Sequence, residues 1–198
     1  GGKSTLMKIL RGECEIDSGR VIRQNSISIE MLAQTPRFDD RLSVKDALNY
    51  ELKEIFDARD EYESVLAQIS NEHDNPELLH RQDELVKFIE SKDGWNIENK
   101  IERILDSFGL REYENGLVNS LSGGEIRRVV LGALILKKPD VLLLDEPTNH
   151  LDVDAKEELK RALKAFKGSI LLISHEPDFY QDIATDVWNC ETWTTKVF

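Results

Sequence analysis

Two kinds of hydrophobic pattern alternate along the chain and predict a mixed α/β protein. Continuous apolar runs of strand length occur at 141–144 and 170–173, as in strands that are covered on both faces of a sheet. Helical patterns lie beside them at 125–136 and 155–166. Strands that alternate with helices imply a mostly parallel sheet with helices on its faces.

Shorter segments before and after this alternation complete the predicted architecture. A helix begins near Thr5, and strand candidates follow at 20–23 and 26–32. A strand-like run occurs at 186–190. Gly168 is expected to cap the C-terminus of the helix at 155–166. The predicted fold class is therefore α/β, with a parallel sheet and flanking helices.

Residues 43–120 have a different character and are predicted to form a helical subdomain. Apolar residues recur there at three- and four-residue steps, as on one face of a long helix. These residues are Leu48, Leu52, Ile55, Tyr62, Leu66 and Ile69, with Arg59 in the one vacant step. After a polar turn, a second pattern comprises Leu78, Leu79, Leu85, Val86 and Ile89. Because neither helix can bury its stripe alone, we expect an antiparallel hairpin over 44–93, followed by a third helix over 97–108.

Negative charge is concentrated in the same part of the chain. The formal net charge is −12, and residues 46–106 contain 17 acidic residues against 7 basic ones. Binding to nucleic-acid phosphates depends on clustered Lys and Arg. The composition therefore argues against broad electrostatic attraction to nucleic acid, and the predicted hairpin is an acidic arm.

Composition and termini restrict the cellular setting. The sequence has no apolar run long enough to cross a bilayer and no secretory signal. Its two cysteines, Cys14 and Cys190, lack metal-ligand spacing and form no disulfide scaffold. We expect a reducing, cytoplasmic setting without membrane insertion. Because the chain has no initiator Met, we also expect a fragment that is truncated at both ends.

The first five residues are typical of a phosphate-binding loop. In Gly1-Gly2-Lys3-Ser4-Thr5, the glycines let backbone N–H groups turn toward a phosphate, and the helix start adds its positive dipole end. Lys3 would reach the β- and γ-phosphates, and the Ser4 hydroxyl would ligate Mg²⁺. An ordinary helix start is the alternative interpretation.

Polar residues also follow both buried strands. Asp145 stands at the carboxyl end of the first strand, where open α/β sheets place their ligands, and is predicted to hold Mg²⁺. Glu146 points differently and can polarise an attacking water. His175 occupies the parallel place after the second strand, where it can bond the γ-phosphate or the water. The alternatives are a capped turn for the carboxylates and a structural role for the histidine.

Two further segments carry candidate ligands. The Ser122-Gly123-Gly124 turn offers backbone N–H groups and a hydroxyl that suit phosphate oxygens. Gln34 follows a strand candidate, and its side-chain carbonyl can ligate Mg²⁺, although a surface glutamine is the simpler interpretation. Together with the acidic pair and the phosphate loop, these residues indicate nucleotide hydrolysis.

Taken in order, the motifs resemble those of ATP-binding cassette (ABC) ATPases, which have a P-loop NTPase-type fold. The matching elements are the Walker A motif at 1–5, the Q-loop at 34, the signature at 121–125, the Walker B motif at 141–146, the D-loop at 151–152 and the switch histidine at 175. The resemblance extends over essentially the whole chain. Residues 1–198 would therefore be one incomplete ATP-binding cassette.

The resemblance implies a role for each candidate residue. Glu146 and His175 would be catalytic. ATP would be bound by Gly1, Gly2, Lys3, Ser4, Thr5 and Gln34, and Mg²⁺ by Ser4, Gln34 and Asp145. Ser122, Gly123 and Gly124 would contact the ATP of an opposing cassette, with Asp152 near that interface. The partner would be a second cassette, in the same parent chain or in a dimer.

Within the family, Leu144–Asp152 is similar to the ABC-F subfamily, including its Uup-like members. These are soluble proteins with two cassettes in one chain, and many act on the ribosome. The acidic helical insertion agrees, because the first ABC-F cassette often carries an arm at this place. The resemblance implies a translation-linked role with the ribosome or RNA as partner. One departure is Glu176, where Asp is usual.

Two other functions stay open. The chain would be the ATP-binding subunit of a membrane transporter if residues 43–93 coupled to a membrane partner. It would have a binding role without turnover if the arm were only a solvated coiled coil, although the intact Lys3, Asp145, Glu146 and His175 argue against lost catalysis. Because part of the phosphate loop is missing, we expect the isolated 198 residues to bind ATP weakly.

Overall fold

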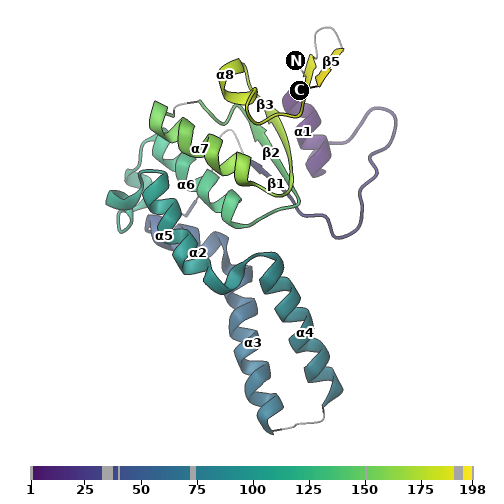
Figure 1. The fold of residues 1–198 in the computed structure, drawn as a ribbon, viewed down its shortest axis with the longest axis vertical. Coiled ribbons are helices and arrows are strands. Elements are labelled where there is room, and N and C mark those ends of the chain that lie inside the picture. The colour runs from purple at the N-terminus through teal and green to yellow at the C-terminus, as the bar shows by residue number, and fades with distance from the viewer. Residues whose placement is uncertain are drawn as a thin grey trace. The chain divides into compact units, whose positions relative to one another are not determined.

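The computed structural model describes residues 2–32, 38–39, 41–71, 75–149, 151–189 and 194–197. It divides into two compact units (Figure 1). The first unit comprises Gly1–Arg37 and Leu121–Phe198, and the second comprises Phe38–Ser120.

A three-stranded parallel sheet lies at the centre of the first unit. Its strands are β1 (Ile29–Leu32), β2 (Val141–Asp145) and β3 (Ser169–Ile173), in the order β1-β2-β3. Val141 pairs with Ile29 on one side and with Ser169 on the other. Because β2 has partners on both sides and helices nearby, its leucines Leu142, Leu143 and Leu144 are fully buried.

Helices flank this sheet, as Figure 1 shows. They are α1 (Lys3–Arg11), α6 (Gly123–Leu136), α7 (Val153–Ala165) and the short α8 (Pro177–Tyr180). Both α1 and α6 contact β1, and Met7, Leu131 and Leu159 are buried from three different helices. The predicted fold class, α/β with a parallel sheet and flanking helices, is confirmed. A separate antiparallel pair joins β4 (Asp186–Asn189) to β5 (Thr194–Val197).

Three details of the sequence prediction for this unit are wrong. Residues 20–23 form no strand; instead, Arg23 donates from Nη2 to the Ile9 carbonyl at 2.9 Å, which satisfies an acceptor at the end of α1. β3 is only half-buried, since it is paired along one edge in the described sheet. Gly168 does not cap α7, whose C-cap is Phe166. A Cβ at Gly168 would lie 2.6 Å from the Asp140 carbonyl oxygen.

The second unit is helical in its described residues. Its elements are α2 (Val44–Glu51), α3 (Lys53–Asn71), α4 (Pro76–Ser91), η1 (Gly94–Asn96), α5 (Ile97–Ser107), η2 (Arg111–Tyr113) and η3 (Val118–Ser120). α3 and α4 lie side by side as a hairpin (Figure 1). Asn75 caps α4 by accepting from the N–H groups of Glu77 and Leu78, and Pro76 suits the first helical turn because it needs no N–H partner there.

The predicted continuous helical seam from Leu48 to Ile69 is wrong in two respects. The helix is interrupted at Leu52, between α2 and α3. Beyond Ile55, which is buried, Ala58 and Val65 are the buried residues of α3, rather than the neighbouring Arg59 and Leu66. They pack against Leu85 and Ile89 of α4, with Tyr62, Ile69, Leu78 and Phe88 alongside. The facing helix, rather than the heptad count, selects the buried stripe.

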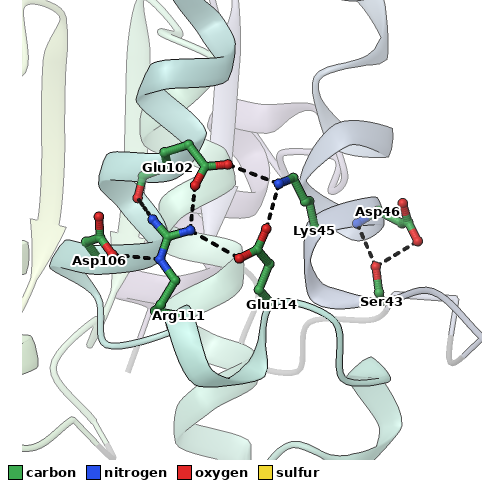
Figure 2. A network of polar contacts seen from close by, with 7 residues as sticks. All are labelled: Ser43, Lys45, Asp46, Glu102, Asp106, Arg111 and Glu114. Carbon is green, nitrogen blue, oxygen red and sulfur yellow. Dashed lines mark hydrogen bonds and ion pairs between the residues drawn. The ribbon is translucent and has the colours of Figure 1, made fainter.

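An ion-pair network joins α2 to α5 and η2 (Figure 2). Lys45 Nζ donates to Glu114 at 2.6 Å and to Glu102 at 3.0 Å. Arg111 Nε donates to Asp106 at 2.7 Å, and the same guanidinium reaches Glu102 and Glu114. The contacts of Arg111 and Lys45 hold the pKa of Glu102 below its ordinary 4.5, and those of Lys45 and Arg111 lower the pKa of Glu114.

This network predicts a loss of stability in acid. A carboxyl whose pKa is lowered by folding stabilises the folded state fully above its unfolded value, and that stabilisation is lost as the pH falls through the lowered pKa. We expect Lys45→Met to lower the urea midpoint at neutral pH. The difference from wild type should shrink well below pH 4.5, where Glu102 and Glu114 are protonated. Urea titrations followed by circular dichroism measure both values.

The control for this experiment is Lys87→Met. Lys87 is exposed and pairs with Asp83 within the single helix α4, so its removal breaks no contact between elements. It should lower the midpoint less than Lys45→Met does, because exposed pairs within one helix contribute little. Equal midpoints for the two variants at neutral pH would contradict a structural role for the network.

Candidate functional site

The phosphate-binding loop is described from Gly2 onward. Gly2 is the N-cap of α1 with φ +98°, a left-handed conformation that favours glycine, and no side chain caps the helix. The first N–H groups of α1 have no acceptor within the helix, so they and the positive dipole end are available to an anion. Lys3 and Ser4 occupy the first turn and are half-buried.

The end of β2 carries the two predicted carboxylates. Asp145 is the last residue of the strand and only 9% exposed. Glu146 has φ +47°, a left-handed conformation that is costly for a residue with a Cβ. Its N–H nevertheless donates to the Ile173 carbonyl of β3 at 2.9 Å. The chain therefore turns at Glu146, directly after Asp145 and Ile173, the last residue pair of β2 and β3.

The structure brings Glu146 and His175 together. Their Oε1 and Nε2 atoms are 3.3 Å apart, and Asn149 Nδ2 donates to the other carboxylate oxygen, Oε2, at 2.6 Å. The Glu146 side chain is 39% exposed, so water has access to it. A solvent-accessible carboxylate that is oriented by two neighbours can orient and deprotonate a water molecule.

Arg127 is a residue of this site that sequence reasoning missed. It lies on α6, is only 7% exposed and donates from Nη2 to the carbonyls of Asp145 and Glu146, at 2.9 and 2.6 Å. Burial lowers its pKa, and the carboxylates of Asp145 and Glu146 oppose this shift. A signal was present in the sequence, because Arg127 shares a helical face with Leu131 and Leu134, both of which are buried.

The signature residues form the N-terminus of α6. Ser122 is the N-cap, and Ser122 and Glu125 form a capping box in which the hydroxyl accepts from the Glu125 N–H at 3.3 Å. The hydroxyl proton is still available to an external acceptor. Gly123 and Gly124 place their N–H groups at the open end of the helix, and a Cβ on Gly123 would contact no atom within 4 Å. This surface suits an anion that approaches from outside.

The remaining predicted site residues are Asp152, Thr5, Gly1 and Gln34. Asp152 is the N-cap of α7 and accepts from the Ala155 N–H at 2.8 Å, which gives it a structural role. Thr5 is exposed on α1. Gly1 and Gln34 lie outside the described residues, so their predicted roles remain predictions.

The donor atoms present fit Mg²⁺ that binds together with a nucleotide. Mg²⁺ is held by oxygen ligands, typically one or two carboxylates with substrate phosphates and water. Within the described part of the chain, no three His, Cys, Asp or Glu side chains gather into a metal cluster. Asp145 offers one carboxylate at the sheet edge, and Ser4 offers a hydroxyl in the helix start. A carboxylate and a hydroxyl are ligands that suit a metal which also binds phosphate oxygens.

A glycine-led helix start, an acidic strand end and a parallel sheet define a P-loop type of nucleotide-binding domain. The model of the ABC transporter family matches residues 1–149, and the chain belongs to this family. No helix among the described residues is long and apolar enough to cross a membrane.

Two curated relatives match almost the whole chain. ATP-binding protein Uup of Haemophilus influenzae is 36% identical over 186 residues, which cover 94% of this chain and 28% of the relative. Energy-dependent translational throttle protein EttA of Escherichia coli is 36% identical over 184 residues, 92% of this chain and 33% of the relative. Both are ABC-F proteins, so the resemblance to that subfamily is confirmed. The chain spans about a third or less of the length of these relatives.

A solved structure supports the fold. An ATP-binding subunit of an ABC transporter superposes with a TM-score of 0.66 at 18% sequence identity, covering 93% of this chain and 68% of that chain. The similarity extends beyond the parallel sheet to nearly all of the chain.

Proposed function

We propose that this chain is an ATP-hydrolysing cassette of a cytoplasmic ABC-F-type ATPase that acts in translation. The observation that carries the proposal is the 3.3 Å contact between Glu146 and His175 at the carboxyl edge of the sheet. It brings together a carboxylate and an imidazole from two strand ends, and such a pair can orient the water that attacks a γ-phosphate. The family of the chain and its similarity to EttA, an energy-dependent translational throttle protein, support the ATPase activity and the role in translation.

Each residue would have one task in this reaction. The α1 N-terminus and Lys3 would bind the phosphates, with Asp145 and Ser4 holding Mg²⁺, which when bound neutralises charge that develops on the phosphoryl oxygens. Glu146, steadied by Asn149, would orient the attacking water and accept its proton. His175 would hold the γ-phosphate or that water on the opposite side.

A second cassette would complete the site. Ser122 and the free N–H groups of Gly123 and Gly124 face outward from α6 as an anion-binding surface, which would serve ATP on the opposing cassette. The reciprocal surface of the partner would close this chain's own site. We propose that the partner cassette lies in the same protein, since this chain corresponds to about a third of EttA.

The acidic arm is evidence that the protein binds a macromolecular partner. The hairpin consists of two packed helices, α3 and α4 (Figure 1), and most of their exposed charged residues are acidic. A solvated acidic hairpin has no evident role in nucleotide hydrolysis itself. We propose that it connects the ATP cycle to the ribosome.

This proposal is tested with the full-length protein that contains the chain. We expect its ATP turnover to increase when ribosomes of the same organism are added. Replacing the hairpin between Lys53 and Ser91 with a short loop should abolish that increase and leave ribosome-free turnover within about twofold, a difference below 1 kcal/mol in barrier height. ATP turnover that does not change with ribosomes but increases with a co-purifying integral membrane protein would instead support a transporter subunit.

A further inference from the structure

Glu176, the residue after the switch histidine, connects three segments of the first unit. Its Oε1 accepts from the Thr148 hydroxyl at 2.6 Å, and its Oε2 accepts from Lys156 Nζ of α7 at 2.7 Å. Its own N–H donates to the Ser174 hydroxyl at 3.1 Å. Thr148 is 3% exposed. The hydrogen bonds from Lys156 and Thr148 hold the pKa of Glu176 below its ordinary 4.5, so the group is a carboxylate at neutral pH.

The contacts of Glu176 and those of Glu146 join the same two loops, in opposite directions. The last paired residues of β2 and β3 are Asp145 and Ile173, so the two loops separate just beyond them. Glu146, from the first loop, reaches His175 in the second. Glu176, from the second loop, reaches Thr148 in the first. Two reciprocal cross-links therefore fix the loops where strand pairing has ended.

Lys156 connects Glu176 to α7. Lys156 lies one turn after Asp152, the N-cap of that helix, and its ammonium ends on Glu176. Glu176 thus sits between the helix that begins at the D-loop and the loop that carries His175. A side chain in that position can determine where the imidazole lies without touching nucleotide.

We propose that Glu176 is a positioning residue: by binding Thr148 and Lys156, it holds the His175 loop at the distance from Glu146 that ATP hydrolysis requires. The inference rests on the proposed ATPase function. The carboxylate must accept from two donors on different segments at once, so the length of the glutamate side chain is needed for this role. Aspartate, shorter by one methylene, would reach one donor at a time.

The test is a double-mutant cycle in the full-length protein, with the variants Glu176→Gln and His175→Ala. Glu176→Gln keeps the shape and the acceptor for Thr148 but removes the charge that faces Lys156. We expect kcat to fall about tenfold, as for a small misplacement of a catalytic group, with the KM for ATP nearly unchanged. In the His175→Ala background the same substitution should change kcat less than twofold. An equal loss in both backgrounds would overturn the proposal, since a general structural role predicts it.

A second readout does not depend on turnover. Hydrogen exchange at residues 174–176, measured without nucleotide, should accelerate in Glu176→Gln and in the near-isosteric Thr148→Val. The matched control is Lys160→Met, also on α7, whose ammonium contacts Asp182 and the Asp178 carbonyl instead; it should leave both exchange and kcat unchanged. Accelerated exchange in a protein without ATPase activity would refute the proposed function and keep the positioning role. Unchanged exchange in both network variants would refute the positioning role.

Discussion

Replacing Glu146 with glutamine in the full-length protein is expected to lower ATP turnover by roughly 10²- to 10³-fold, as for the loss of a general base. Glutamine keeps the size of the side chain and an oxygen that can accept from Asn149, which donates to Glu146 at 2.6 Å. It loses the negative charge that faces His175 and would receive a proton from water. Asp145 and the α1 N-terminus are untouched, so ATP should still bind.

The variant should therefore accumulate the closed, ATP-loaded state. Phosphate release at steady state measures turnover, and ATP-dependent compaction measured by small-angle scattering reports closure. The corresponding glutamate of the second cassette is replaced as well, so that its activity does not obscure the result. The control is Glu157→Gln, an exposed acidic residue on α7. Unchanged turnover in the double variant would decide against the role assigned to Glu146.

Much of the first unit could be predicted because its signals are local. Three consecutive leucines, Leu142 to Leu144, favour a strand that is covered on both faces, and β2 is such a strand. The Ser122 turn contains a capping box that sequence alone specifies. Residues that end a buried strand of a parallel sheet must also meet at one edge. For that reason the proximity of Glu146 and His175 followed from their places in the sequence.

The rest depended on partners that are distant in sequence. No glycine or proline marks the break at Leu52, whose N–H bonds back to the carbonyls of Leu48 and Asn49. Ala58, rather than Arg59, is buried because α4 lies on that side. Likewise, no sequence signal marks the positive φ of Glu146. The cross-links that settle this turn arise only when three segments come together.

Arg127 is the second position where a single substitution should have a large effect. Glu146 pays about 1–2 kcal/mol for its left-handed conformation, and the Arg127 guanidinium, donating to the carbonyls of Asp145 and Glu146, is one of the contacts that hold it. Burying the guanidinium is itself unfavourable, and its Nε has no hydrogen-bond partner. Arg127 is therefore better explained by the geometry it imposes than by a large net contribution to stability.

Arg127→Met, which fills similar space, should consequently lower the free energy of unfolding by only about 2 kcal/mol. Two carbonyls lose a donor, at about 1–3 kcal/mol each, while the cost of burying the charge and the unpaired Nε is relieved. Turnover should fall more steeply than stability, by about tenfold or more, because Glu146 loses its position. Arg127→Lys, which keeps the charge but not the longer, planar guanidinium, should recover part of the stability and little of the turnover. Urea titration and phosphate release separate the two effects. A fully active, folded Arg127→Met protein would show that the β2 turn holds Glu146 without help from α6.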